Sequence, residues 1–359
     1  MKRKYPTAEA IHVLIASTVF CGIAAQATAV EVKPTPVNPL DAQRAFGYLK
    51  RICDLGPRIS GTSGMEKQQA LLEAFFTKAG GKVSAQRFLA DNPLGGSKVP
   101  MTNLIVEWHP ERKDRILICT HYDTRPHADH DLDPVKRREG VFLGANDGAS
   151  GVAVMMELAH LMPTLQGPLG VDFLLLDGEE LVYVDPRDPY CLGSTWFAQQ
   201  YVAEPPPYKY RWGVLMDMVG DANLQLFQEH YSATWADTRP LVKAIWATAA
   251  RLGVKEFIPR SKYLVSQDDH LPLRNTAKIP TCDIIDFVDA SGNPPPITWH
   301  TTKDDPQHCA PSSLAKVGWV VYEWIKAEQA AAHAPKAAAP QSSLTPTTNG
   351  AIANPGAGR

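Results

Sequence analysis

The sequence predicts an α/β fold in which a mainly parallel sheet is covered by helices on both faces. Short apolar runs rich in branched residues alternate along the chain with stretches of helical periodicity. Polar residues capable of chemistry follow several of these runs directly, as they do at the carboxyl ends of parallel strands. The chain has 359 residues, of which 44% are hydrophobic, so it can bury a full core in one large domain.

The N-terminus has the features of an export signal. Basic residues at positions 2–4 precede a short apolar run at 11–25, and small residues at 25–29 offer cleavage sites. The run is too short and too weakly apolar for a good membrane span, although an uncleaved anchor is the alternative. We therefore expect residues 1–29 to be a signal peptide. The mature protein is expected in the periplasm or outside the cell, with no stable membrane insertion.

The rest of the chain is predicted to be one catalytic domain with an irregular segment at each end. Residues 30–40 are rich in proline and are expected to form an extended lead-in. Residues 328–359 consist largely of Ala, Pro, Ser, Thr and Gly, which cannot bury enough apolar surface to order themselves, so we expect a disordered tail. The catalytic domain would then span residues 41–327.

Helices and strands are expected to alternate within these limits. The first helix begins near Asp41, whose side chain can cap it, and ends at Gly56. Apolar runs predict strands at 103–108, 115–120, 171–177 and 212–218. Helical periodicity marks further segments at about 63–79, 151–162, 194–202, 239–252 and 312–330.

Charge and cysteine content exclude several classes of protein. Lys and Arg total 36 against 38 Asp and Glu, so the chain lacks the basic excess that is typical of nucleic-acid-binding proteins. Nucleic acid is therefore not expected as a partner. The chain has 6 cysteines including Cys21 in the predicted signal, and no pair has C-x-x-C spacing. This pattern argues against a zinc finger or a dense disulfide framework and allows at most two bridges.

Polar residues stand where the apolar runs stop. Residues 121–123 (HYD) and 177–180 (DGEE) follow two of the runs, and Asp217 lies near the end of another. The loop 144–151 (GANDGASG) leads into a helix, and the segment 299–301 (WHT) comes late in the chain. Mixed ligation by His, Asp and Glu suits Zn²⁺ in a catalytic site, where three protein ligands leave room for water or substrate.

The adjacent carboxylates Glu179 and Glu180 favour a division of roles. Successive residues cannot easily ligate one metal from the same direction, so one is expected to bind the metal and the other to act as acid and base. Single residues have structural alternatives: Asp147 could cap the following helix, and His121 could be a hydrogen-bonded core residue. Their joint occurrence in this order is far less expected by chance.

The order of the motifs HYD, NDGASG, DGEE, MDMVG and WHTTKDD resembles that of the zinc-dependent aminopeptidase superfamily, which includes the glutaminyl-peptide cyclotransferases. The resemblance covers residues 44–324 and implies a single α/β domain with a central mixed sheet. It implies that Asp147, Glu180 and His300 are the ligands of one zinc ion, and that Glu179 is the general base and acid.

Several segments resemble the cyclotransferase branch more closely, among them AQRFLADNPLG, DDHLPL and WHTTKDD. This likeness implies conversion of an N-terminal glutaminyl residue of a peptide to pyroglutamate with release of ammonia. Asp217 and Asp268 would form a carboxylate pair that orients the reacting groups and shares a proton. Trp299 would form a wall for the substrate side chain, although a core aromatic is the alternative.

Three departures from the animal cyclases concern the pocket and not the predicted metal ligands. Residues 181–184 (LVYV) stand where the animal enzymes have a Trp, the disulfide partner of Cys119 is missing, and Asp283 takes the place of a His. The main alternative is a two-zinc aminopeptidase, with a second metal on His121 and Asp217 and with Asp147 bridging. A binding protein without turnover is a third possibility, against which the intact DGEE motif argues.

Overall fold

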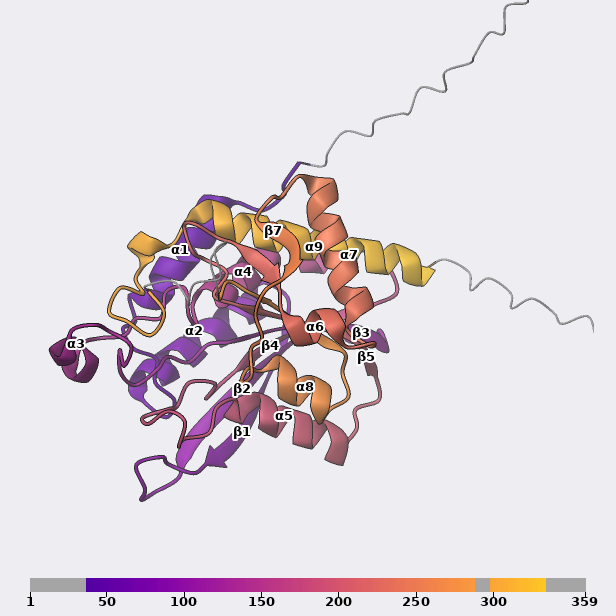
Figure 1. Ribbon diagram of the computed structural model, residues 1–359. Helices are drawn as coiled ribbons and strands as arrows, with labels where there is room; N and C mark the ends of the chain where they lie inside the picture. Colours follow the sequence, from indigo (N-terminus) through magenta and orange to yellow (C-terminus); the bar gives the residue numbers. More distant parts are fainter. Residues whose placement is uncertain (1–36, 288–297, 334–359) are drawn as a thin grey trace, which may run out of the picture. The chain divides into compact units, whose positions relative to one another are not determined.

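The computed structural model describes residues 37–287 and 298–333, and it confirms the α/β fold with a mixed, mainly parallel sheet (Figure 1). The six-stranded sheet has the order β1-β2-β4-β3-β5-β8. Pairs β1-β2 and β2-β4 are antiparallel, whereas β4-β3, β3-β5 and β5-β8 are parallel. The strands are β1 (Lys82–Ala90), β2 (Val99–Trp108), β3 (Asp114–His121), β4 (Gly170–Leu176), β5 (Lys209–Asp217) and β8 (Thr281–Ile285).

Helices cover both faces of this sheet. One layer contains α1 (Ala42–Cys53), α2 (Ser63–Lys78), α4 (Ser150–Leu158), α7 (Arg239–Leu252) and α9 (Pro311–His333). The opposite face packs against α5 (Leu192–Ala203) and α8 (His270–Asn275). The smaller elements are α3 (Pro134–Glu139), α6 (His230–Thr234), the 3₁₀ turns η1 (Met162–Thr164) and η2 (Pro306–His308), and a parallel pair of β6 (Leu226–Gln228) and β7 (Phe257–Ser261).

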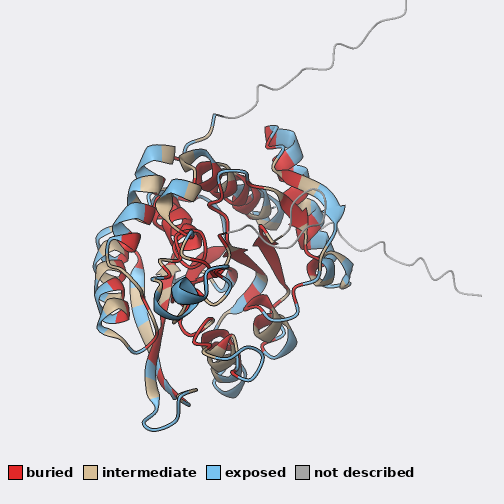
Figure 2. Cartoon of the chain, turned by 60° about the vertical axis from the view of Figure 1, so that its left-hand side comes forward, coloured by how far each residue is buried: buried red, intermediate tan, exposed pale blue. Residues whose placement is uncertain are grey.

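The central strands are apolar on both faces because both faces are covered. In β3, Ile116 and Ile118 belong to the core under the larger helical layer, whereas Leu117 and Cys119 belong to the core under α5 and α8. All four of these side chains are fully buried, and Figure 2 shows the same burial in the neighbouring strands. Such double-sided burial explains why these segments are continuous apolar runs and lack alternation.

The four predicted strands and the long predicted helices are present, but several elements have no counterpart in the sequence-based prediction. Strand β1 is an edge strand in which four residues are exposed and two are buried, and β8 has an acidic residue, Asp283, in its centre. Neither is a clean apolar run. The short helices α3, α6 and α8 have 5 or 6 residues each, which is too short for a helical period to be recognised.

Helix α9 continues to His333, so residues 328–333 are not part of a disordered tail as predicted. The side-chain amide of buried Gln329 explains the extension. Its oxygen accepts from the Leu169 N–H and its nitrogen donates to the Leu169 carbonyl, both at 2.8 Å. These two bonds tie the last turns of the helix to the segment that precedes β4.

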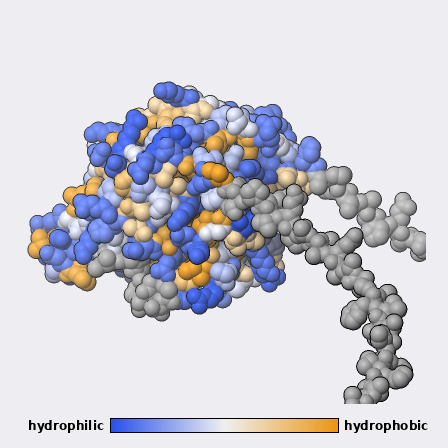
Figure 3. All heavy atoms as spheres, turned by 90° about the horizontal axis from the view of Figure 1, so that it is seen from above, coloured by the Kyte–Doolittle hydropathy of each residue, from blue (hydrophilic) through white to orange (hydrophobic). Residues whose placement is uncertain are grey.

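The predicted signal peptide, residues 30–36 of the lead-in, and residues 334–359 lie outside the described residues. Within the described part of the chain, the cysteines Cys53, Cys119, Cys191, Cys282 and Cys309 are all buried and free. In that part no helix combines the length and apolarity needed to cross a membrane. The face in Figure 3 is largely hydrophilic, with apolar residues scattered among the polar ones.

Candidate active site

The carboxyl ends of the parallel strands meet at one edge of the sheet, where the predicted site residues converge. β3 ends at His121, β5 ends at Asp217, and β4 ends just before the segment 177–180. The neighbouring positions of β4, β3 and β5 in the sheet bring these segments together although they are distant in sequence.

The predicted zinc ligands Asp147, Glu180 and His300 contact one another. The His300 Nε2 atom lies 2.9 Å from the nearer Glu180 oxygen and 3.5 Å from an Asp147 oxygen. All three side chains are buried. Burial, followed by the charge of Asp147, raises the pKa of Glu180 well above its usual range. Burial and nearby cationic groups lower the pKa of His300 well below its usual range, which favours the neutral, metal-binding ring.

These features fit a divalent metal ion. Two buried carboxylates beside a neutral imidazole form the mixed donor set that zinc accepts, and a cation would offset their mutual repulsion. The ring atom Nδ1 of His300 has no hydrogen-bond partner among the described residues. Donor atoms of His121, Asp147 and Glu180 also lie within 4.8 Å of one another.

Two buried carboxylates hold the loops that carry the ligands. Asp123 accepts hydrogen bonds from the backbone N–H groups of residues 179–180 at 3.1 and 3.0 Å. Asp304 accepts from the N–H groups of residues 146–147 at 2.7 and 3.0 Å. Gly148 adopts a φ of +99°, and a Cβ atom there would lie 2.5 Å from the Asp123 carbonyl oxygen. Only glycine therefore allows the two loops to approach so closely.

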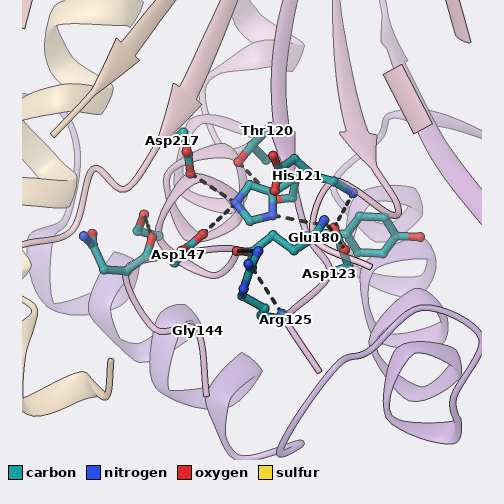
Figure 4. A network of polar contacts seen from close by, with 12 residues as sticks. Thr120, His121, Asp123, Arg125, Gly144, Asp147, Glu180 and Asp217 are labelled. Atoms are coloured by element: carbon teal, nitrogen blue, oxygen red, sulfur yellow. Dashed lines mark hydrogen bonds and ion pairs between the residues drawn. The ribbon is translucent and has the colours of Figure 1, made fainter. Parts of the chain in front are cut away.

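His121 links the two carboxylates that the aminopeptidase interpretation assigns to a second metal. Its Nε2 atom lies 3.1 Å from Asp147 Oδ1 and 3.1 Å from Asp217 Oδ1, as Figure 4 shows. Burial alone would lower the pKa of His121, but Asp217, Asp123 and Asp147 together raise it well above its usual range. Burial also raises the pKa of Asp217 to about 6. The side chains that would bind a second metal therefore lie together, with the His121 ring in contact with both carboxylates.

Glu179 lines the same pocket as the predicted ligands. Burial raises its pKa well above the usual range, and Glu180 adds to this shift while His121 opposes it. Its Oε1 atom lies 3.7 Å from the Cys191 thiol, which donates a weak hydrogen bond. A carboxyl group with a raised pKa is suited to proton transfer near neutral pH.

The pocket has a volume of about 170 Å³ and contains every predicted site residue except His121. Trp299 forms part of its wall and is half-buried. The Trp299 ring packs edge-to-face on Phe287 at 5.3 Å and lies 4.1 Å from the His300 ring. A larger groove of about 580 Å³ is lined by residues of α1 and α2, but none of its lining residues is a carboxylate.

Several residues that shape the site received no role from the sequence. Asp123 and Asp304 stand inside the motifs HYD and WHTTKDD, so those motifs could have drawn attention to them. Buried Arg125 had no such signal. Its backbone N–H donates to Glu180 at 3.1 Å, and its guanidinium donates to Asp129 at 2.7 Å and to the Tyr190 hydroxyl at 3.0 Å.

Residues 103–325 match the sequence model of peptidase family M28. The chain belongs to peptidase family M28. Among solved members of this fold, the glutaminyl cyclase of Fimbriiglobus ruber is 38% identical with a TM-score of 0.74, and the match covers 82% of this chain and 97% of that one.

The M28 relatives have more than one named activity. A leucine aminopeptidase precursor from Bacteroides thetaiotaomicron is 33% identical with a TM-score of 0.73, covering 82% of this chain and 98% of that chain. The glutaminyl-peptide cyclotransferase of Bos taurus is 25% identical over 269 residues, which cover 66% of this chain and 68% of the relative. The comparisons therefore support an enzyme of the M28 or glutaminyl cyclase kind.

Proposed function

We propose that this protein is a zinc-dependent glutaminyl-peptide cyclotransferase, which converts N-terminal glutaminyl residues of peptides to pyroglutamate and releases ammonia. The observation that carries the proposal is one small pocket in which Glu179 and Trp299 lie beside the predicted zinc ligands Asp147, Glu180 and His300. This pocket brings together a carboxyl group for proton transfer, one metal site and an aromatic wall. The similarity to the Fimbriiglobus ruber glutaminyl cyclase supports the same conclusion.

Asp147, Glu180 and His300 would hold one zinc ion. When bound, zinc would polarise the γ-carbonyl of the glutaminyl side chain and stabilise the negative charge that develops on its oxygen. The buried position of these three residues keeps bulk water from competing for that oxygen.

Glu179 would transfer the proton in the reaction. The α-amine nitrogen of the substrate attacks the γ-carbonyl carbon, and Glu179 accepts the proton that this nitrogen loses. The bond from that carbon to the amide nitrogen then breaks, and Glu179 returns the proton to the departing nitrogen, which leaves as ammonia. The raised pKa of Glu179 favours the return step, because it makes the carboxyl group a stable proton carrier at neutral pH.

Asp217 and Asp268 would orient the substrate amide, and Trp299 would limit the space for the glutaminyl side chain. All three residues line the pocket. A pocket of about 170 Å³ is small, which is consistent with admission of one N-terminal side chain and not a longer peptide segment.

A two-zinc aminopeptidase is the second candidate, because His121 and Asp217 converge with the other ligands and a relative bears that name. The deciding experiment incubates the purified protein with a peptide that begins with Gln and with the same peptide beginning with Leu. We expect loss of one ammonia from the Gln peptide, an unchanged Leu peptide, and about one zinc per chain by elemental analysis. Removal of the terminal Leu, with about two zinc ions, would contradict the proposal.

A further inference from the structure

A second buried polar cluster lies behind the pocket. It consists of Asp268 and His270 at the start of α8, Asp283 in the centre of β8, and Glu229 at the N-cap of α6. Of these side chains only Asp268 lines the pocket, and none is more than 4% exposed. The cluster therefore joins the candidate catalytic pocket to the protein interior.

The His270 ring lies between carboxylates on both sides. Its Nδ1 atom is 3.7 Å from Asp268 Oδ2 and 3.8 Å from Asp283 Oδ2, and its Nε2 atom is 3.7 Å from Glu229 Oε2. Glu229 is itself fixed, because it accepts the N–H groups of Tyr231 at 2.9 Å and Ser232 at 2.7 Å. None of these distances is a hydrogen bond, so the ring packs between Asp268, Asp283 and Glu229 and limits their movement by contact.

Asp268 and Asp283 cannot both be anions at low cost. Both are buried, and their inward-facing oxygens have no hydrogen-bond partner among the described residues. Oδ1 of Asp268 is already engaged by the Asp269 N–H at 2.5 Å, which leaves Oδ2 to face the cluster. Burial, followed by the charges of Asp268 and Glu229, raises the pKa of Asp283 well above its usual range. Two such carboxyls are expected to share one proton.

We propose that Asp283 and His270 are positioning residues for Asp268. The protonated carboxyl group of Asp283 donates a hydrogen bond to Oδ2 of Asp268, and His270 holds the pair against Glu229. Asp268 is then held in one orientation at the pocket wall, where its carboxylate can accept a hydrogen bond from a substrate amide. This inference rests on the proposed role of Asp268 in the cyclisation reaction.

The test compares two substitutions at one position with a matched control. Asp283→Asn keeps a donor toward Asp268, whereas Asp283→Leu removes it with the same branching of the side chain. The control is Asp286→Asn, since Asp286 is also buried, directly follows β8 and does not line the pocket. Zinc content and thermal unfolding show which variants are folded and loaded. Each variant is assayed on whichever of the Gln and Leu peptides the wild-type enzyme converts, so absence of cyclisation contradicts only the proposed function.

We expect Asp283→Leu to lower kcat by about 10- to 100-fold with little change in KM and in zinc content. Asp283→Asn should stay within about 5-fold of wild type, and Asp286→Asn should match wild type. An infrared difference spectrum between wild type and Asp283→Asn should also contain the carbonyl band of a protonated carboxylic acid. This band depends on the shared proton and not on turnover.

Three results would overturn the proposal. Wild-type kcat in a folded Asp283→Leu enzyme would show that Asp268 needs no support. An equal loss in both Asp283 variants would show that a donor at this position is not sufficient. Loss of a bound metal ion on Asp283→Asn substitution would show that the cluster is a metal site and not a proton-sharing pair.

Discussion

Two buried charged clusters lie at opposite ends of the parallel strands, and they differ in how completely their charges are satisfied. At the amino ends, Arg115 of β3 pairs with Asp172 of β4, and both side chains are fully buried. The guanidinium also donates to the carbonyls of Trp108, His109 and Arg112 at 2.9 to 3.0 Å. Asp172 accepts a further bond from the Tyr210 hydroxyl at 2.6 Å.

At the carboxyl ends, carboxylates outnumber cations and polar atoms remain without partners. Asp147, Glu180 and Asp217 surround His121, whose Nδ1 atom has no hydrogen-bond partner among the described residues. The same is true of Nδ1 of His300. A cluster that stabilises the fold satisfies its groups internally, whereas a cluster built for a metal ion and a substrate leaves donors and acceptors for them. The contrast separates a structural ion pair from a candidate active site.

The largest expected effect of a single substitution comes from the acid and base at the carboxyl end. Glu179→Gln should lower kcat by about 10²–10⁴-fold, because the amide cannot carry the proton. Zinc content and the unfolding temperature should stay close to wild type, since Glu179 is not a predicted ligand. Steady-state kinetics and elemental analysis on the same preparation measure both quantities. A Glu179→Gln enzyme that retains its activity would remove Glu179 from the mechanism.

Removal of the metal should abolish activity and leave the protein folded, including the Arg115–Asp172 pair at the amino ends of the strands, which is called the amino-end cluster below. Dialysis against a chelator is expected to remove the zinc and the turnover together, and added Zn²⁺ should restore both. Glu180→Gln should weaken zinc binding at least about 10-fold and make the restoration incomplete. Circular dichroism should show that the apo-protein keeps its fold. Full activity in metal-free protein would contradict a zinc-dependent reaction.

The amino-end cluster should show the opposite behaviour. Arg115→Met leaves Asp172 buried without its cation, and we expect it to lower the free energy of unfolding by about 3–5 kcal/mol. The kcat of the folded fraction should stay within about 2-fold of wild type, since a structural ion pair acts on stability and not on chemistry. The double variant Arg115→Met, Asp172→Leu is the control and should recover much of the stability. A strong loss of kcat in a folded Arg115→Met enzyme would show that the two ends are coupled.

The sequence predicted the parts of the site that follow strong strand signals. His121, Glu180 and Asp217 come at or just after long apolar runs, so their common edge could be inferred from the parallel sheet. The pocket wall was harder to predict from the sequence. Its residue Phe287 follows β8, and this strand is only 5 residues long and contains buried Asp283, so it gives a weak strand signal. The proposed role of Asp283 could not be predicted from the sequence, because it depends on tertiary contacts with His270 of α8 and Ser232 of α6.

The last prediction concerns a buried acid outside both clusters, Asp286, and it tests whether burial alone produces the shifts at the carboxyl end. Burial raises the pKa of Asp286 to about 8, although the Gln225 N–H donates to it at 3.0 Å. The unfolded value is about 3.9. Between these values the folded state holds a proton that the unfolded state has lost, so this group's stabilising contribution declines as the pH rises from about 4 to about 8.

Asp286→Asn removes this titration and keeps an acceptor for Gln225. The wild type loses stability between pH 5 and pH 8 through this acid, and the variant does not. The difference in unfolding temperature, variant minus wild type, should therefore be larger at pH 8 than at pH 5, by roughly 2–4 °C for each kcal/mol that the wild type loses. Scanning calorimetry at both pH values, on zinc-loaded protein, measures the difference, and all other acids cancel in the comparison. A difference that does not change with pH would mean that water reaches Asp286 and that burial is incomplete. The raised pKa of Glu179 would then need its charged neighbours, and not burial, as the main cause.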